Sequence, residues 1–150
     1  MLERRFQESI HIHAASMGVW RVVTDFGSYS KWNPFLVTVA GACAVGSRCE
    51  LAVRMGSGDV RRFAADVTLL AAGRALRWRS VWGAAVCLEV EQGFTLEPLD
   101  KHTTLFIYDM RLWGALAPVA ARSFEGGLSI QMARMNKMLR AMAETRTCVA

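Results

Sequence analysis

Between residues 36 and 113 the chain consists of six strand-like segments separated by short turn signals. The segments are Leu36–Ala42, Arg48–Met55, Arg62–Leu70, Ala75–Trp82, Val86–Leu96 and Thr103–Trp113. Glycine or proline stands in each connection between them. Short connections of this kind join neighbouring antiparallel strands, so the middle of the chain is expected to form an antiparallel meander.

The residues before this meander are expected to form one further strand and two short helices. Phe6–Ala14 alternates near its end, as a strand does. Ser16 stands where the N-cap of a helix belongs, and Gly27 follows that helix as a stop. Ser28 is expected to cap one more helical turn, which Pro34 ends because the residue before a proline avoids the helical region.

The residues after the meander, Ala120–Thr145, are predicted to form one long amphipathic helix. Apolar residues recur there at steps of three and four, namely Leu128, Met132, Met135, Leu139 and Met142. Antiparallel strands twist and do not stay flat, so this helix is available to fill a concave side. The predicted fold class is therefore α+β, with a seven-stranded curved antiparallel sheet around a long C-terminal helix and two short helices after the first strand.

The composition fits a single domain, which we expect to span residues 1–150. Hydrophobic residues make up 53% of the chain, and the excess over a minimal core could fill a large interior, line a cavity or form an oligomer interface. No apolar run reaches the roughly 18 residues of a membrane span. The first residues lack the apolar stretch of a signal peptide. A cytoplasmic protein without stable membrane insertion is expected.

The charge distribution, the cysteine spacing and the missing motifs argue against a nucleic-acid-binding, disulfide-bonded or cofactor-dependent protein. The net charge is +5, but the basic residues are scattered, so no nucleic-acid partner is expected. Cys43, Cys49, Cys87 and Cys148 lack the CxxC spacing and are predicted to be free thiols in a reducing compartment. There is no GxGxxG or Walker motif, so no cofactor is expected. There is also no GxSxG motif, so a nucleophilic triad is not expected.

A histidine pair, His11 and His13, shares one face of the first predicted strand, as metal-binding HxH pairs do. Ile10 and Ile12 take the other face, which should be the core side. The histidines are therefore expected to face solvent, and a metal site would need a third ligand. No metal is expected.

Five segments resemble the START-like superfamily, also called SRPBCC. They are VWRVVTDFGSYSKWNPF (Val19–Phe35), LRWRS (Leu76–Ser80), EQGFTLEP (Glu91–Pro98), TTLFIYDMRLWG (Thr103–Gly114) and MARMNKMLRAMAE (Met132–Glu144). The chain is similar in particular to the polyketide cyclase/dehydrase-like bacterial branch. The resemblance implies a helix-grip fold, as in the birch pollen allergens, with a hydrophobic cavity between sheet and helix. It does not fix a reaction, because the superfamily contains lipid carriers, hormone receptors, cyclases and co-chaperone domains.

Two positions depart from the pattern of similar bacterial members. A His often stands where this chain has Gln92, and a Glu often stands near Met110. Both departures remove a titratable group, which lowers the expectation of acid–base chemistry. Tyr108 and Gln92 remain weak catalytic candidates, because both could polarise a carbonyl by hydrogen bonding.

Strand alternation assigns the faces of the last two strands. One parity of Val86–Leu96 is apolar except for Gln92, so that parity is expected to face inward. A buried amide without a partner costs about 1–3 kcal/mol, so Gln92 is expected to meet a protein group, a water or a ligand. On the next strand the parity of Tyr108 is taken as inward, because the other parity carries Asp109 and Arg111. On the strand before them Arg77 and Arg79 are expected to point to solvent.

These faces and the long helix predict the wall of a small-molecule cavity. The predicted ligand-binding residues are Trp32, Trp78, Gln92, Phe94, Phe106, Tyr108, Met110, Met135 and Leu139. A filled core is the alternative interpretation of the same residues. Trp32 lies in the stretch SKWNPF, which is expected to close one end of the cavity, with Asn33 tying down the turn backbone.

The predicted function is the binding of a small hydrophobic molecule, polyketide-, lipid- or terpenoid-like, by a carrier or sensor. One alternative is a cofactor-independent polyketide cyclase or dehydratase that acts by templating and hydrogen bonding, and whether the chain is an enzyme stays open. A second alternative is a protein-interaction module like the co-chaperone members. The apolar stretch Leu112–Ala120 is expected to be an entrance flap or a homodimer contact.

Overall fold

The computed structural model describes residues 3–82, 88–124 and 127–149. The elements follow one another as β1 (Glu3–Ile12), α1 (Ser16–Thr24), the short 3-10 helix η1 (Phe26–Ser28), α2 (Tyr29–Trp32), β2 (Leu36–Ala40), β3 (Arg48–Arg54), β4 (Val60–Ala71), β5 (Ala75–Trp82), β6 (Leu88–Pro98), β7 (Thr104–Trp113), α3 (Ala117–Phe124) and α4 (Leu128–Val149). The strands form one antiparallel sheet in the order β1-β7-β6-β5-β4-β3-β2. This is the predicted meander, with the first strand added beside the last.

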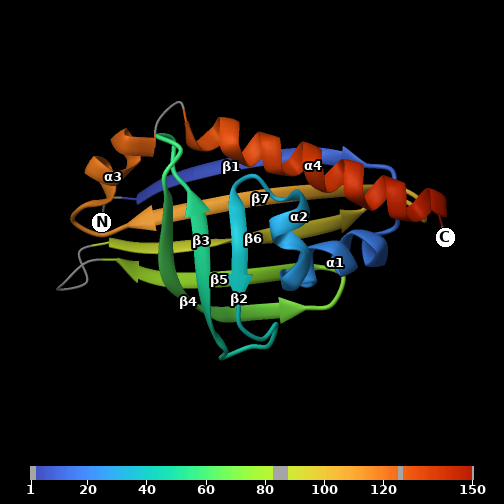
Figure 1. Cartoon of the computed structure of the whole chain (residues 1–150), viewed down its shortest axis with the longest axis horizontal. Helices are drawn as coiled ribbons and strands as arrows, with labels where there is room; N and C mark the ends of the chain where they lie inside the picture. The colour runs from blue at the N-terminus through green and yellow to red at the C-terminus, as the bar shows by residue number, and fades with distance from the viewer. Residues whose placement is uncertain (1–2, 83–87, 125–126, 150) are drawn as a thin grey trace.

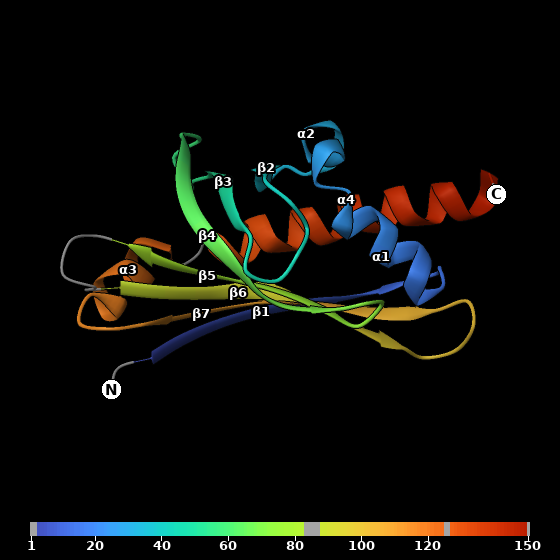
Figure 2. The same cartoon turned by 90° about the horizontal axis from the view of Figure 1, so that it is seen from below.

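The sheet bends around the long helix. Figure 1 shows α4 lying along the sheet, with α1 and α2 beside it. Figure 2 shows β2, β3 and β4 turning away from the plane of β1, β5, β6 and β7. The helix packs against β1, β7, α1 and α2. The predicted α+β helix-grip fold, a curved seven-stranded sheet with a long C-terminal helix, is confirmed.

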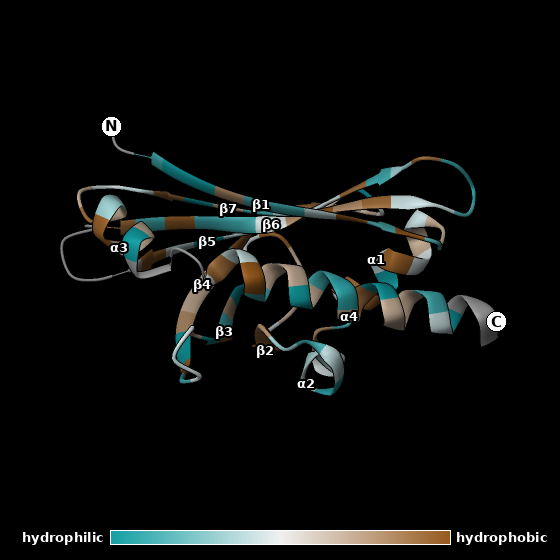
Figure 3. Ribbon diagram, turned by 90° about the horizontal axis from the view of Figure 1, so that it is seen from above, coloured by the Kyte–Doolittle hydropathy of each residue, from teal (hydrophilic) through white to brown (hydrophobic). Residues whose placement is uncertain are grey.

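The predicted faces of β6 and β7 are confirmed by burial. On β6 the buried side chains follow every second position, and on β7 they do the same from Thr104 to Leu112. Figure 3 shows hydrophilic and hydrophobic residues alternating along these strands. The apolar face of the sheet therefore forms the core with α4, because alternate side chains point to opposite faces.

Two expectations about the helix caps are wrong in detail. Ser16 is the first residue of α1, and the N-cap is Ala15, whose carbonyl accepts the first helical hydrogen bonds from Gly18 and Val19. Ser28 stands at the N-cap position of α2, but its hydroxyl donates to the Asp25 carbonyl at 2.8 Å and makes no capping hydrogen bond to the helix.

The predicted single helix over Ala120–Thr145 is two helices, α3 and α4. The interruption falls where the sequence has Gly126-Gly127. Glycine costs a helix interior about 1 kcal/mol relative to alanine. α4 begins directly after this pair, at Leu128, and the amide of Gln131 donates to the Gly127 carbonyl at 3.0 Å.

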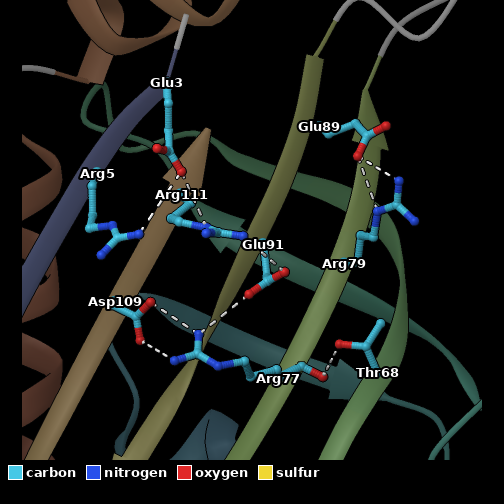
Figure 4. A network of polar contacts seen from close by, with 9 residues as sticks. All are labelled: Glu3, Arg5, Thr68, Arg77, Arg79, Glu89, Glu91, Asp109 and Arg111. Carbon is cyan, nitrogen blue, oxygen red and sulfur yellow. Dashed lines mark hydrogen bonds and ion pairs between the residues drawn. The ribbon is translucent and has the colours of Figure 1, made fainter. Parts of the chain in front are cut away.

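The outer face of the sheet carries a network of ion pairs (Figure 4). The Arg77 guanidinium donates to both carboxylate oxygens of Asp109, at 2.8 and 3.0 Å, and lies 3.8 Å from Glu91. Arg111 lies 3.6 Å from Glu91 and 3.5 Å from Glu3. Arg77 therefore lies on the outer face as expected, but it does not point to solvent. Only 22% of its side chain is exposed, because it reaches two strands across to Asp109.

Two of the four cysteines can be assigned in the described part of the chain. Cys43 and Cys49 are free thiols. Cys87 and the side chain of Cys148 lie outside the described residues. No helix in the described ranges combines the length and apolar character needed to cross a membrane.

Candidate functional site

Aromatic rings fill the interior between the sheet and the helices. Phe94 lies at the centre, with its ring centroid 5.6 Å from Trp78, 5.0 Å from Tyr108 and 5.3 Å from Phe106. Every residue of the predicted wall is at most 4% exposed, namely Trp32, Trp78, Gln92, Phe94, Phe106, Tyr108, Met110, Met135 and Leu139. Most of them pack against one another as core.

A pocket opens at one end of this core, where the turn between β3 and β4 meets the start of α4. Its enclosed volume is about 30 Å³, and the whole depression, open solvent included, is about 460 Å³. The lining residues are Phe35, Val53, Arg54, Met55, Gly56, Gln92, Met110, Gly127, Leu128 and Gln131. Of the predicted wall, Gln92 and Met110 line this pocket, and the other seven residues lie deeper in the core or to its side.

Gln92, which lines the pocket, forms a buried polar pair with Tyr108. They are diagonal neighbours, because Gln92 stands opposite Met110 and Tyr108 stands opposite Phe94. The Tyr108 hydroxyl donates to Gln92 Oε1 at 2.6 Å. Burial raises the pKa of Tyr108 well above its ordinary value, and the charge of Asp109 adds to this, so the phenol is a neutral donor.

The hydrogen bond from Tyr108 also fixes the orientation of the Gln92 amide. Among the described residues the Gln92 side chain makes this one hydrogen bond, and it is accepted by Oε1. The amide NH₂ group is the remaining donor of Gln92, whose side chain lines the pocket. The expected partner of the buried amide is thus Tyr108, which satisfies the Gln92 oxygen. The Gln92 NH₂ group is left for a hydrogen-bond acceptor that enters the pocket.

The SKWNPF stretch closes an end of the core mainly through its turn. Asn33 Oδ1 accepts hydrogen bonds from the amides of Phe35 at 3.0 Å and Leu36 at 2.9 Å, which is the expected tie of the turn backbone. The Trp32 ring lies 5.2 Å from that of Tyr29. Trp32 Nε1 is buried without a hydrogen-bond partner within the described ranges. An unmet buried donor is costly, so this end of the core has unused hydrogen-bonding capacity.

Several pocket residues were not predicted from the sequence. Gln131 could have been found, because it lies three residues after Leu128 and four before Met135 on one helical face. Arg54 and Met55 could not, because they approach α4 only through the bend of β2, β3 and β4. Register irregularities in the β2–β3 and β4–β5 pairings accompany this bend.

The histidine pair does not contribute to a site in the core. His11 and His13 are exposed, whereas Ile12 is buried, as the alternation predicted. Within the described ranges, no three His, Cys, Asp or Glu side chains are grouped as a metal ion would require.

Comparison with solved structures identifies the fold. The aromatase/cyclase Zhui from Streptomyces sp. R1128 superposes with a TM-score of 0.79 at 16% identity, covering 97% of this chain and 96% of that chain. A START superfamily protein from Mycobacterium smegmatis gives 0.72 at 20% identity, with 94% and 97% covered. Norcoclaurine synthase from Thalictrum flavum, in complex with dopamine and hydroxybenzaldehyde, gives 0.72 at 9% identity, with 96% and 88% covered.

Comparison of the sequence identifies the family. A search of curated proteins found none with a matching sequence. The family described as polyketide cyclase / dehydrase and lipid transport matches residues 3–144. One of the structural neighbours of this chain is described as a START superfamily protein, which is the superfamily that the sequence motifs resemble. Since the match spans nearly all of its length, the chain belongs to the polyketide cyclase / dehydrase and lipid transport family.

Proposed function

We propose that this protein binds a small hydrophobic molecule that carries an oxygen acceptor, with Gln92 as its polar contact. The supporting observation is the Gln92 amide, which is held by Tyr108 and lines a pocket with apolar neighbours. Phe35, Val53 and Leu128 supply apolar surface that a hydrophobic ligand would contact. A carbonyl or ether oxygen on that ligand would accept from the Gln92 NH₂ group.

The small volume of the pocket sets a condition on binding. A free space of about 30 Å³ holds only a few water molecules, so a larger ligand must displace side chains. Met55, Met110 and Gln131 line the pocket and are unbranched and flexible. We therefore expect the ligand to enter between the β3–β4 turn and α4 and to move these side chains aside.

The charges around the pocket favour a carrier or sensor over an acid–base enzyme. Arg54 is the one ionisable residue among the described residues that line it. Its guanidinium donates to the Gly58 carbonyl at 3.1 Å, which ties it to its own turn. Acid–base catalysis needs a group that gains or loses a proton near neutral pH, and the neutral phenol of Tyr108 donates to Gln92 instead.

A second candidate is a cofactor-independent cyclase or dehydratase. It is favoured by the likeness in fold to an aromatase/cyclase. In this case the pocket would hold a reactive polyketide-like substrate in a folded conformation, and the Gln92 NH₂ group would polarise one of its carbonyls. Tyr108 would act as a positioning residue, because its hydroxyl reaches Gln92 rather than the ligand.

Native mass spectrometry of freshly purified protein tests the proposed binding. A discrete co-purifying molecule is expected, and denaturing extraction would give its chemical class. The double variant Gln92→Leu with Tyr108→Phe should retain it at least about tenfold less, because one hydrogen bond inside an apolar site contributes about 1–2 kcal/mol. Tyr29→Phe is the matched control, since it removes another buried phenol that donates to the Val23 carbonyl.

Two outcomes would refute this assignment. Equal ligand retention by the double variant and the wild type would remove Gln92 and Tyr108 from the polar wall. An apo protein that takes up no apolar probe with a carbonyl group in titration would reject the pocket itself. A ligand that is released chemically changed would favour the cyclase.

The stretch Leu112–Ala120 is proposed as a contact between two copies of the chain. Leu112 and Ala117 are buried, but Leu116 and Val119 are 46% and 63% exposed. Two exposed apolar side chains, Leu116 just before α3 and Val119 within it, suit a weak interface. Sedimentation-velocity ultracentrifugation should show a monomer–dimer equilibrium that Leu116→Glu shifts to monomer. A monomer at every concentration would exclude the dimer.

A further inference from the structure

A second hollow, which we name the basic cleft, lies at the opposite end of α4 from the pocket. It is lined by His13, Arg21, Lys101, His102 and Arg146, together with the small or apolar Ala14, Ala15, Met17, Gly18 and Ala143, and its volume is about 440 Å³. Figures 1 and 2 both place α1, the β6–β7 turn and the C-terminal end of α4 at this end. With a helical rise of 1.5 Å per residue, roughly 27 Å separates Leu128 from Arg146.

The cations of the basic cleft lack acidic partners. Within the described residues, no ion pair joins Arg21, Lys101 or Arg146 to a carboxylate, and no acidic side chain lines the cleft. Asp100 stands next to Lys101, but its carboxylate accepts the backbone amide of His102 at 2.7 Å. By contrast, four arginines of the outer sheet face are paired with carboxylates of other strands, namely Arg48, Arg62, Arg77 and Arg79.

The start of α1 adds favourable backbone groups to the cleft. α1 begins there with Ala15 as N-cap, without a side-chain cap and without an acidic residue in its first turn. A helix start carries partial positive charge and unused amide donors. Met17 and Gly18, in the first turn of α1, line the cleft together with Ala15. Basic side chains from three separate segments therefore surround a hollow that no carboxylate lines.

We propose that the basic cleft binds a phosphomonoester group of a small molecule. Two arginines and a lysine give three permanent positive charges, which a doubly charged phosphate balances better than a single carboxylate. Arginine forks bind phosphate oxygens in pairs. A volume of about 440 Å³ leaves room for an organic group attached to the phosphate. This site is independent of the pocket at Gln92.

Nuclear magnetic resonance titration of the labelled protein with phenyl phosphate tests the proposal. Amide signals of residues 14–18 and 101–103 should shift, and benzoate should shift them much less. Arg21→Gln with Arg146→Gln should weaken phenyl phosphate at least roughly tenfold, since charge-assisted hydrogen bonds are the strong ones. Arg4→Gln with Arg61→Gln removes the same charge elsewhere and should leave the affinity unchanged. The spectra of each variant also report whether it is folded.

A second arm separates a soluble phosphate from a lipid headgroup. Cosedimentation is measured with phosphatidylcholine vesicles with and without phosphatidic acid. Binding only to phosphatidic acid vesicles, lost in the Arg21/Arg146 variant, would assign the phosphate to a lipid. No response to either probe, or equal phenyl phosphate affinity in the wild type and the Arg21/Arg146 variant, would overturn the proposal.

Discussion

Replacing Gly93 by alanine is expected to lower the free energy of unfolding by about 3 kcal/mol or more, as severe overpacking of a core does. A Cβ atom at Gly93 would lie 2.2 Å from the Leu76 carbonyl oxygen and 2.9 Å from Arg77 Cα and Cγ. Gly93 stands between Arg77 on β5 and Asp109 on β7. The missing side chain lets the Arg77 guanidinium cross β6 to Asp109. Alanine would therefore push against a paired strand and against the ion pair together.

Urea denaturation followed by circular dichroism measures this loss. Gly27→Ala is the matched control, because the nearest atom to its added Cβ would be an Asp25 oxygen at 4.0 Å. That variant should stay within about 1 kcal/mol of the wild type. Asp109→Asn removes the ion pair without adding a Cβ, and should cost about 1–3 kcal/mol. A Gly93→Ala protein as stable as the Gly27→Ala protein would contradict the close packing of β5 and β6.

Period-two alternation made the inner face of the sheet predictable. Gln92 and Tyr108 were placed inward from parity alone, and the structure joins them by a hydrogen bond. The reason is local, since a strand with one apolar parity has only one face that can be buried. Asn33 was predictable for a similar reason, because a short amide side chain readily accepts nearby backbone amides.

The remaining features depend on contacts between distant segments. Arg77 looked solvent-exposed from its own strand, and only the pairing with β6 and β7 reveals its path over Gly93. The pocket position depends on how far the β3–β4 turn leans toward Leu128, which the spacing of residues does not encode. Phe94 and Trp78 fit either a filled core or a cavity wall, and packing in three dimensions decides between them.

At alkaline pH this protein is expected to unfold, and its tyrosines are expected to ionise in the same transition. The chain has two tyrosines, Tyr29 and Tyr108, and both are fully buried. Their hydroxyls donate to the Val23 carbonyl and to Gln92 Oε1. Burial raises the pKa of each well above the ordinary value of 10.0, and for Tyr29 the neighbouring Tyr108 adds to the rise. In the unfolded chain both would ionise near pH 10.

The sign of the effect follows from these directions. Above pH 10 the folded state holds two protons that the unfolded state has lost, so the stability contributed by both phenols is complete below pH 10 and decreases as the pH rises. Each group contributes about 1.4 kcal/mol per pH unit, or about 2.7 kcal/mol per unit for the pair. A domain of ordinary stability would then unfold within a few pH units.

Tyrosinate absorbance and circular dichroism, recorded together during an alkaline titration, measure this coupling. The two signals should change in one transition well above pH 10, whereas in urea the absorbance should change near pH 10. Tyr29→Phe and Tyr108→Phe should each remove about half of the pH dependence, which separates the phenols from lysines and thiols. Tyrosinate that forms near pH 10 while the circular dichroism stays native would show that a phenol is accessible, and the aromatic core would then be more open than the packing around Phe94 allows.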